Sequence, residues 1–477
     1  MKKLTALFLA LAMVLSLAAC SNTGNGEMDN KGGSGSGGNS SSQGNGGQNN
    51  DSQGGEKQDD IVLWTLSNDL KQFAERYEEQ TGNHVEVVVF DSADFETKIM
   101  QTLGAKSKDL DVFVGEPQML PNFYEAGFCA DLSALDGEVK TRLVDYTYEA
   151  GCDEDGVLRA ISYQACPGSV IYRRDLAKEV FGTDDPDEIA KHFSSFEEIE
   201  KTADTLQAKG YCVFGDEGAL RWFSNRDPWV KDGQIIINQD RLDYMDCATH
   251  LYQNDQVAYA LEWSAPWYAS MAGPLPKISE AQSGDVWGMD KDQLISEGAA
   301  GGAGITQVFS YVMPSWGALI VRDNAEGNKG NFGVCSGPCS FFGGGTFLAV
   351  NEFSQHKEAA QKFIEFCTLN DETSQWWLEA SNGDVVNNKA VLENNKDYQN
   401  ESFGNQNTYA FYLAEMEKID FNLTGYDDAC KDEWGKAITA VKKGEKTKEQ
   451  AVQDFYQNVI TLFPELSVPA DSPYYNG

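Results

Sequence analysis

Residues capable of covalent chemistry occur in this 477-residue chain, but none of them completes a known catalytic motif. Gln164-Ala-Cys-Pro-Gly168 follows part of the caspase nucleophile pattern, which requires another residue in place of the proline and a histidine about 50 residues upstream. The nearest upstream histidine is His84, inside a predicted strand. The motifs HExxH and GxSxG are absent, and the glycines at 343–345 lack the lysine of a phosphate-binding loop. The 74 acidic residues leave paired carboxylates for glycoside hydrolysis open.

Aromatic residues in polar loops indicate binding chemistry. Sugar rings stack their C–H faces on Trp and Tyr, and sugar hydroxyls need planar hydrogen-bonding partners such as Glu, Asn, Gln and Arg. For Trp267 and Trp316 the alternative is packing in the core. For Asn225 the alternative is that it and Arg226 stabilise their own loop. The candidate ligand contacts in the three aromatic segments 221–229, 261–268 and 308–317 are Asn225, Trp267, Ser315 and Trp316.

The segment 161–175 marks a change in the organisation of the chain. Two short apolar runs flank Pro167-Gly168, which predicts a strand, a sharp bend and a second strand. Tyr163 and Gln164 precede the bend and can face a ligand. Our hypothesis is that the chain leaves a first lobe here and enters a second, with a binding cleft between them. A globular body of about 420 residues, more than one core usually holds, agrees with two lobes.

The sequence before this bend alternates between strand and helix patterns. One predicted helix carries Leu70, Phe73 and Tyr77 on the same face, and Gly82 ends this helix. Short strands that are apolar on both faces favour a parallel sheet covered by helices. Strands are predicted at 61–65, 84–90 and 110–115, with a second helix at 94–103.

The carboxyl ends of parallel strands are where such sheets bind ligands. The loops at these ends contain Ser67, Asn68, Glu116 and Gln118. We expect the first three to contact a ligand. For Glu116 the alternative is a helix-capping carboxylate.

Two capping boxes and a third amphipathic pattern predict helices in the second half of the chain. Ser195–Glu198 and Thr447–Gln450 open helices, and another spans 356–369.

A run of three glycines precedes an apolar strand that ends at Val350. Gly344 and Gly345 let backbone amides approach a ligand closely. Asp384 follows Gly383 and is either a ligand contact or the residue that fixes a turn.

The N-terminus predicts export and lipid anchoring. A positive start and an apolar core from Leu4 to Leu17 have the length of a signal peptide. Leu17-Ala-Ala-Cys20 resembles the lipobox of bacterial lipoproteins; the alternative is an ordinary secretory signal. We therefore expect a signal peptide at 1–19, and a lipidated Cys20 followed by a flexible Gly/Ser/Asn linker to residue 58.

Composition limits the partners of the globular body. A formal net charge of −37 argues against nucleic acid. Nine cysteines follow Cys20, so at least one thiol is free or pairs between chains. Cys335 and Cys339 are the only close pair, and a local disulfide and two free thiols are both open. Zinc is not expected, because no second Cys or His pair stands at ligand spacing.

The order of several segments between residues 61 and 466 resembles extracellular solute-binding protein family 1, the lipoprotein receptors of carbohydrate ABC transporters. The segments that carry the resemblance are Asp111-Val-Phe-Val-Gly-Glu116 followed by 125–132, the opening stretch through Tyr172-Arg-Arg-Asp-Leu-Ala, Pro314-Ser-Trp-Gly317, and Phe342-Gly-Gly-Gly-Thr346 before the helix with 359–366.

The resemblance implies a two-lobed α/β fold of the type II periplasmic-binding-protein kind, with a ligand cleft between the lobes. Each lobe is expected to contain a mostly parallel sheet flanked by helices. The chain would cross between lobes near Gln164, Gly343 and Asp384. Lobe 1 would comprise 59–163 plus 344–385, and lobe 2 would comprise 164–343 plus 386–477.

The same resemblance implies a receptor without covalent chemistry, cofactor or metal. Its partners would be a carbohydrate, in particular an oligosaccharide, and the membrane subunits of an ABC permease. The protein would be a monomer held on the outer face of the cytoplasmic membrane by its lipid anchor. The alternatives are an exported glycoside hydrolase and the same binding fold serving a non-sugar solute or a sensor.

Overall fold

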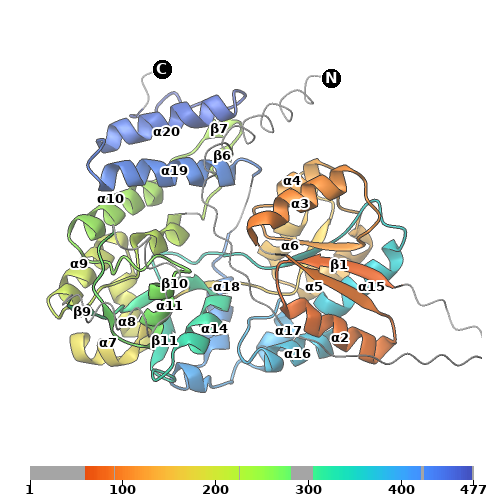
Figure 1. The fold of residues 1–477 in the computed structure, drawn as a ribbon, viewed down its shortest axis with the longest axis horizontal. Coiled ribbons are helices and arrows are strands. Elements are labelled where there is room, and N and C mark those ends of the chain that lie inside the picture. The colour runs from red at the N-terminus through yellow and green to blue at the C-terminus, as the bar shows by residue number, and fades with distance from the viewer. Residues whose placement is uncertain (1–59, 91, 225, 281–303, 421–423, 475–477) are drawn as a thin grey trace, which may run out of the picture. The chain divides into compact units, whose positions relative to one another are not determined.

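Four of the five strands of the first sheet run in the same direction, as expected for a mostly parallel sheet. The computed structural model describes residues 60–90, 92–224, 226–280, 304–420 and 424–474 (Figure 1). β1 pairs in parallel with β2 and β3, and the strand order is β2-β1-β3-β12-β4. β12 is antiparallel to both of its neighbours. The strands are β1 Ile61–Thr65, β2 Val85–Val89, β3 Val112–Gly115, β4 Ala160–Ser162 and β12 Phe347–Val350.

Helices pack on this sheet and complete the first core. Leu70, Phe73 and Tyr77 are buried in it, and Gly82 ends their helix with a left-handed φ of 76°, as predicted. Tyr77 packs edge-on against Phe363 of α15. The helices are α2 Asp69–Thr81, α3 Ser92–Gly104, α4 Leu120–Glu125, α5 Asp136–Arg142, α6 Asp145–Gly151, α15 Lys357–Thr368, α16 Asp371–Ala380, α17 Lys389–Asn394 and α18 Thr408–Met416, with a 3-10 turn η2 at Ser133–Leu135.

The second sheet is antiparallel, which corrects the expectation of a mostly parallel sheet in each lobe. β5 lies between β10 and β11 and runs against both. The physical reason is that β5 begins where the chain arrives from the first sheet, whereas β11 ends where it returns. Because the chain enters β5 and leaves β11 at the same end of the sheet, these two strands must run in opposite directions. The strands are β5 Gly168–Arg173, β10 Ser310–Pro314 and β11 Phe332–Cys335, with two small ribbons β6 Val230–Lys231 with β7 Gln234–Ile235 and β8 Leu275–Pro276 with β9 Ile305–Thr306.

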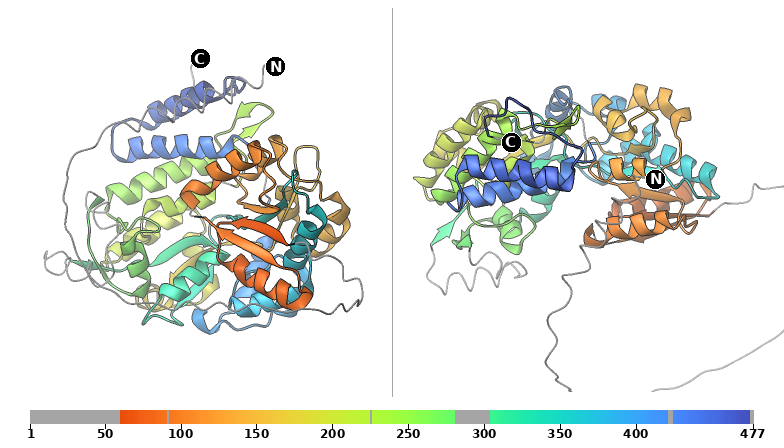
Figure 2. Two further views of the ribbon diagram at one scale, coloured as in Figure 1. Left: turned by 45° about the vertical axis from the view of Figure 1, so that its right-hand side comes forward. Right: turned by 90° about the horizontal axis from the view of Figure 1, so that it is seen from above.

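Alternate residues of the second sheet enter two apolar clusters. Val170 and Tyr172 belong to one, and Ile171 between them belongs to the other. α19 packs on α20 on one side and on α10 on the other (Figures 1 and 2). The elements are α7 Arg174–Phe181, α8 Pro186–Ala190, α9 Phe196–Gln207, α10 Gln239–Gln253, α11 Ala265–Ala272, α14 Ser315–Asn324, α19 Asp427–Lys442 and α20 Lys448–Leu462, with the 3-10 turns η3 Lys191–Phe193, η4 Glu217–Ser224 and η5 Glu401–Phe403.

Three chain segments meet between the two sheets and hydrogen bond to one another. We call residues 163–168, 341–343 and 385–387 the crossing ribbon; the first of them lies between the other two. Two of these segments thus follow the predicted crossings near Gln164 and Gly343. In each bond a backbone amide donates to a backbone carbonyl. The donor and acceptor residues are Gly168 and Phe341 (2.8 Å), Gly343 and Cys166 (3.1 Å), Ala165 and Val385 (2.9 Å), and Asn387 and Tyr163 (2.8 Å).

The first core extends beyond residue 385, because Val391 and Leu392 of α17 pack into it. The body of the chain forms a single compact unit. The lobe boundaries at 163/164, 343/344 and 385/386 therefore stay a prediction.

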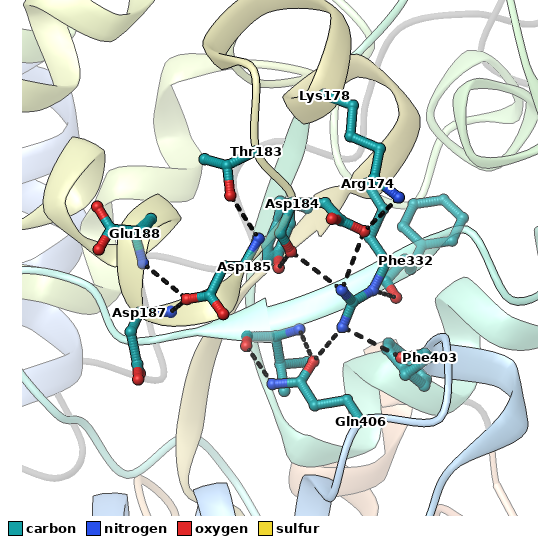
Figure 3. Close-up of polar contacts among 12 residues, drawn as sticks. Arg174, Lys178, Thr183, Asp184, Asp185, Asp187, Glu188, Phe332, Phe403 and Gln406 are labelled. Atoms are coloured by element: carbon teal, nitrogen blue, oxygen red, sulfur yellow. Dashed lines mark hydrogen bonds and ion pairs between the residues drawn. The ribbon is translucent and has the colours of Figure 1, made fainter.

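Arg174 fixes the chain after α17 to the second sheet (Figure 3). Its Nε donates to the Phe332 carbonyl (2.9 Å) and its Nη2 donates to Gln406 Oε1 (3.1 Å). Gln406 in turn donates from Nε2 to the Val334 carbonyl (2.7 Å). The segment around Gln406 is thus bonded to the backbone of β11.

The nine cysteines in the described part of the chain are free thiols. Cys335 is buried and Cys339 is half-buried, so of the two possibilities for this pair the structure has the free thiols. None of the helices in the described ranges combines the length and apolar character that a bilayer span requires.

The capping box of α20 offers a test of the local fold. Thr447 Oγ1 accepts from the Gln450 amide, and the Gln450 side chain accepts from the Thr447 amide (3.1 Å). Thr447→Ala removes one of these bonds, and we expect it to lower the free energy of unfolding by about 1 kcal/mol. Thr461→Ala, an exposed threonine later in the same helix, is the matched control and should change stability by less than half as much. Equal urea midpoints for the two variants would contradict the prediction.

Candidate functional site

The carboxyl ends of β1, β3 and β4 lie at one edge of the first sheet, beside the crossing ribbon. Phe347 at the start of β12 pairs with Gly115 at the end of β3 and with Ser162 at the end of β4. β1 runs parallel to β3, so Ser67 and Asn68 follow it at the same edge. The structure thus brings the candidates from three separate strands to a common edge, as the strand pattern predicts.

Glu116 directly follows β3 at this edge, and its carboxylate is half-buried. Burial raises the pKa of its carboxyl group, and a hydrogen bond from Gln118 Nε2 (2.5 Å) opposes the shift. Ser67 Oγ accepts from the Asp69 amide (3.1 Å) and so caps α2 in place of the exposed Asn68. Glu116 and Asn68 therefore keep hydrogen-bonding capacity, whereas Ser67 already has a structural role.

Gln164, Tyr163 and Asp384 lie inside the protein at the crossing ribbon. Gln164 Nε2 donates to Asp384 Oδ2 (2.8 Å), and Trp377 Nε1 donates to the same oxygen (2.9 Å). Burial raises the pKa of the Asp384 carboxyl group. Tyr163 is buried against Phe73 and Trp377. All three side chains thus have internal partners, and contact with a ligand stays a prediction for them.

Trp316, in the first turn of α14, approaches the crossing ribbon from the second sheet. Its Nε1 donates to the Gly343 carbonyl (2.9 Å). Gly344 and Gly345 follow with φ angles of 82° and 100°, a region that favours glycine. Ser315 is fully buried, and its Oγ has no hydrogen-bond partner in the described part of the chain. The glycine run and α14 are thus in direct contact, as expected from residues that share one site.

A second indole covers Trp316. Trp263 stacks on it with ring centroids 5.9 Å apart and planes 19° from parallel. Trp263 is 43% exposed, whereas its neighbour Trp267 is 4% exposed and packs against Tyr311. The exposed ring available to a ligand is therefore Trp263, and the predicted Trp267 lies beneath it as support.

A third indole lies on the other side of Gly343. Trp222 of η4 stacks on Phe341, with centroids 5.3 Å apart and planes 17° from parallel. A side-chain carbon added at Gly343 would lie 2.8 Å from the Trp222 ring and 2.2 Å from Pro314 Cγ. The absence of a side chain at Gly343 thus lets Trp222 approach the backbone.

Sequence reasoning missed Trp222 and Trp263 as individual candidates, although it selected the loops that hold them. The signal was the density of aromatic residues in those loops, which does not tell an exposed ring from a supporting one. Asn225 and Cys20 lie outside the described residues.

Asp216 and Glu262 add carboxylates near the indoles. Together with Trp267 and Tyr311 they line a cavity of about 10 Å³, the size of one water molecule. Burial raises the pKa of Asp216 to about 6. Within the described ranges, no three His, Cys, Asp or Glu side chains gather closely enough to hold a metal ion. The site therefore combines flat apolar rings with hydrogen-bonding groups.

Several solved structures share this fold. A crystal structure described as an extracellular solute-binding protein family 1 is 16% identical, covers 84% of this chain and 99% of its own, and superposes with a TM-score of 0.67. An ABC transporter associated binding protein from B. animalis subsp. lactis Bl-04, in complex with β-1,6-galactobiose, is 18% identical over 86% and 99%, with a TM-score of 0.64.

A third similar structure is the galacto-N-biose/lacto-N-biose I-binding protein of an ABC transporter from Bifidobacterium longum, in complex with lacto-N-biose. It is 16% identical, covers 87% of this chain and all of its own, and has a TM-score of 0.64. At these identities the likeness establishes the type II binding-protein fold. No curated protein matches the chain significantly.

The family model described as bacterial extracellular solute-binding protein matches residues 72–404, which is more than half of the chain. This range contains the second sheet, every strand of the first sheet except β1, the crossing ribbon and the three indoles. The members of such a family bind solutes outside the cytoplasm rather than convert them. The chain is a member of the bacterial extracellular solute-binding protein family.

Proposed function

We propose that this protein is the substrate-binding lipoprotein of an ABC importer, and that it captures a carbohydrate, an oligosaccharide in particular, between its two lobes. The observation that carries the proposal is that Trp222 and Trp316 lie next to Gly343 and that the exposed Trp263 stacks on Trp316. Indole faces match the C–H faces of sugar rings, and the carboxylates nearby accept hydrogen bonds from sugar hydroxyls. The complexes of two similar structures with β-1,6-galactobiose and lacto-N-biose support the same ligand class.

Capture would proceed by hinge closure at the crossing ribbon. Positive φ angles occur at Cys166 (48°), Gly344 (82°) and Gly383 (131°), close to the segments that cross. Hinge residues are element-terminal positions that absorb changes in φ and ψ. A sugar that contacts Glu116 on one side and Trp263 on the other favours the closed state by its additional contacts.

Delivery and anchoring complete the proposal. The receptor, a monomer, would be held on the outer face of the membrane through Cys20 and a flexible linker to residue 58. It would present its sugar to a permease, and a partner inside the cell would hydrolyse ATP. The chain itself supplies binding and needs no cofactor for it.

Trp263→Ala tests the ligand class. The substitution removes an exposed stacking face, and we expect it to weaken sugar binding about tenfold while leaving the fold intact. Calorimetric titration with β-1,6-galactobiose, lacto-N-biose and maltose measures the loss, with recovery of intact sugar as a check on hydrolysis. Trp376→Ala, a half-buried tryptophan on α16, is the matched control and should keep the affinity.

Two results would count against the carbohydrate proposal. If the folded wild-type protein binds none of a wide panel of neutral oligosaccharides, the ligand is another solute. If Trp263→Ala and Trp376→Ala weaken binding equally, the indole face is not the platform.

Cys20→Ala tests the anchor separately. Without the thiol the chain cannot be lipidated, so we expect the protein to move from the membrane fraction to the medium. Immunoblots of the two fractions measure the shift, with Cys152→Ala as the control that should remain with the membrane. A Cys20→Ala protein that stays membrane-bound would show that another element holds it.

A further inference from the structure

Each of two loop tryptophans follows directly after one member of an ion pair. Arg221 precedes Trp222 in η4, and Glu262 precedes Trp263 in the loop before α11. Arg221 Nη2 donates to Glu262 Oε2 at 2.5 Å. This bond therefore joins the two loops at the residues adjacent to their indoles.

A third residue closes the connection into a ring. Asp216 Oδ1 accepts from the Gly218 amide (2.7 Å), and its Oδ2 accepts from the Glu262 amide (3.1 Å). Arg221 Nη1 donates to the Gly218 carbonyl (3.1 Å). We call Asp216, Gly218, Arg221 and Glu262 the polar ring. Two of its four bonds lie within the segment 216–221, and the other two join this segment to Glu262, so neither loop can shift without breaking a bond to the other.

The polar ring also holds the backbone that aims Trp263. Trp263 has a φ of 71°, a left-handed conformation that is costly for a bulky residue and persists only when its surroundings enforce it. The Asp216 bond fixes the amide just before Trp263, and the Ser264 amide donates to the Leu261 carbonyl (2.9 Å) just after it. Strain of this kind at an exposed aromatic ring is consistent with a functional placement.

The charges near the ring favour one class of sugar. Arg221 is neutralised by Glu262 and its guanidinium also lies over the Trp222 ring at 4.8 Å. Glu217, next to Asp216, is paired with Lys442. Among the described residues the Asp216 carboxylate forms no ion pair, and it lines the small cavity beside Glu262 and Trp267. A carboxylate at this place repels the carboxylate of an acidic sugar and does not repel an uncharged one.

We propose that the polar ring is the specificity device of this site: it presets the spacing of Trp222 and Trp263, and it admits uncharged sugars while excluding acidic ones. The selection of sugars rests on the proposed function above, whereas the spacing of the indoles does not. Arg221 and Glu262 act as positioning residues, because each works through the tryptophan that follows it.

The spacing can be measured without a ligand. Stacked indoles such as Trp263 and Trp316 give a near-ultraviolet circular dichroism band that depends on their geometry. We expect Arg221→Met and Glu262→Gln in the full-length protein to lose most of this band and to expose an indole to acrylamide quenching. The far-ultraviolet spectrum should stay unchanged. Arg226→Met is the matched control, because Arg226 forms a comparable 2.8 Å ion pair with Asp240 from the loop that follows η4.

The selectivity is measured by titrating the same proteins with β-1,6-galactobiose, lacto-N-biose, maltose and the acidic disaccharide digalacturonate. Wild type should bind at least one uncharged sugar and reject digalacturonate. Glu262→Gln releases the Arg221 charge, so the affinity for digalacturonate relative to the uncharged sugar should rise about tenfold. Arg221→Met should weaken binding of the uncharged sugar and leave digalacturonate unbound. General loosening of the loops would affect the two variants alike, so this difference between them tests the charge.

If the near-ultraviolet spectra of Arg221→Met and Glu262→Gln match that of Arg226→Met, the polar ring does not set the spacing of the indoles. Equal binding of digalacturonate and the uncharged sugars by wild type, or an unchanged ratio in Glu262→Gln, would overturn the selectivity. If wild type binds no sugar at all, the carbohydrate proposal fails together with the selectivity, and the spectra alone decide the spacing.

Discussion

The hydrogen bonding of the crossing ribbon is the constraint on which the rest of this structure depends. Backbone amides and carbonyls removed from water must find partners, and except for Gly168 the three chain segments of the ribbon lie outside the named strands of both sheets. Here the segment 163–168 takes its partners from 341–343 on one side and from 385–387 on the other. The ribbon therefore stays paired while it connects the lobes.

This pairing determines where a ligand can be held. The strands of the first sheet end at the ribbon with Glu116, and α14 of the second sheet begins there with Trp316. The predicted contacts Gln164 and Asp384 hydrogen bond to each other and stabilise the ribbon from inside. The candidate groups just outside the ribbon are aromatic on the second-lobe side and polar on the first-lobe side.

The sequence was sufficient to predict the elements whose periodicity is strong. The alternation from Ile61 to Gly115 predicted both the parallel strands and the edge at which Ser67, Asn68 and Glu116 lie. Strand direction in the second sheet was not predictable from its own residues, because it follows from where the chain enters and leaves. The site was predicted at the level of loops: Trp316 and the glycine run proved to be in contact, but exposure, which distinguishes Trp263 from Trp267, arises from packing between loops far apart in the chain.

The free thiols have a consequence for the life of this chain outside the cell. Burial raises the pKa of each of the nine described cysteines, including the half-buried Cys152 and Cys339. Little thiolate is then present, and thiolate is the species that oxidises and exchanges. An unfolded chain just after translocation has no such protection. Folding therefore protects these thiols from oxidation, because it buries them.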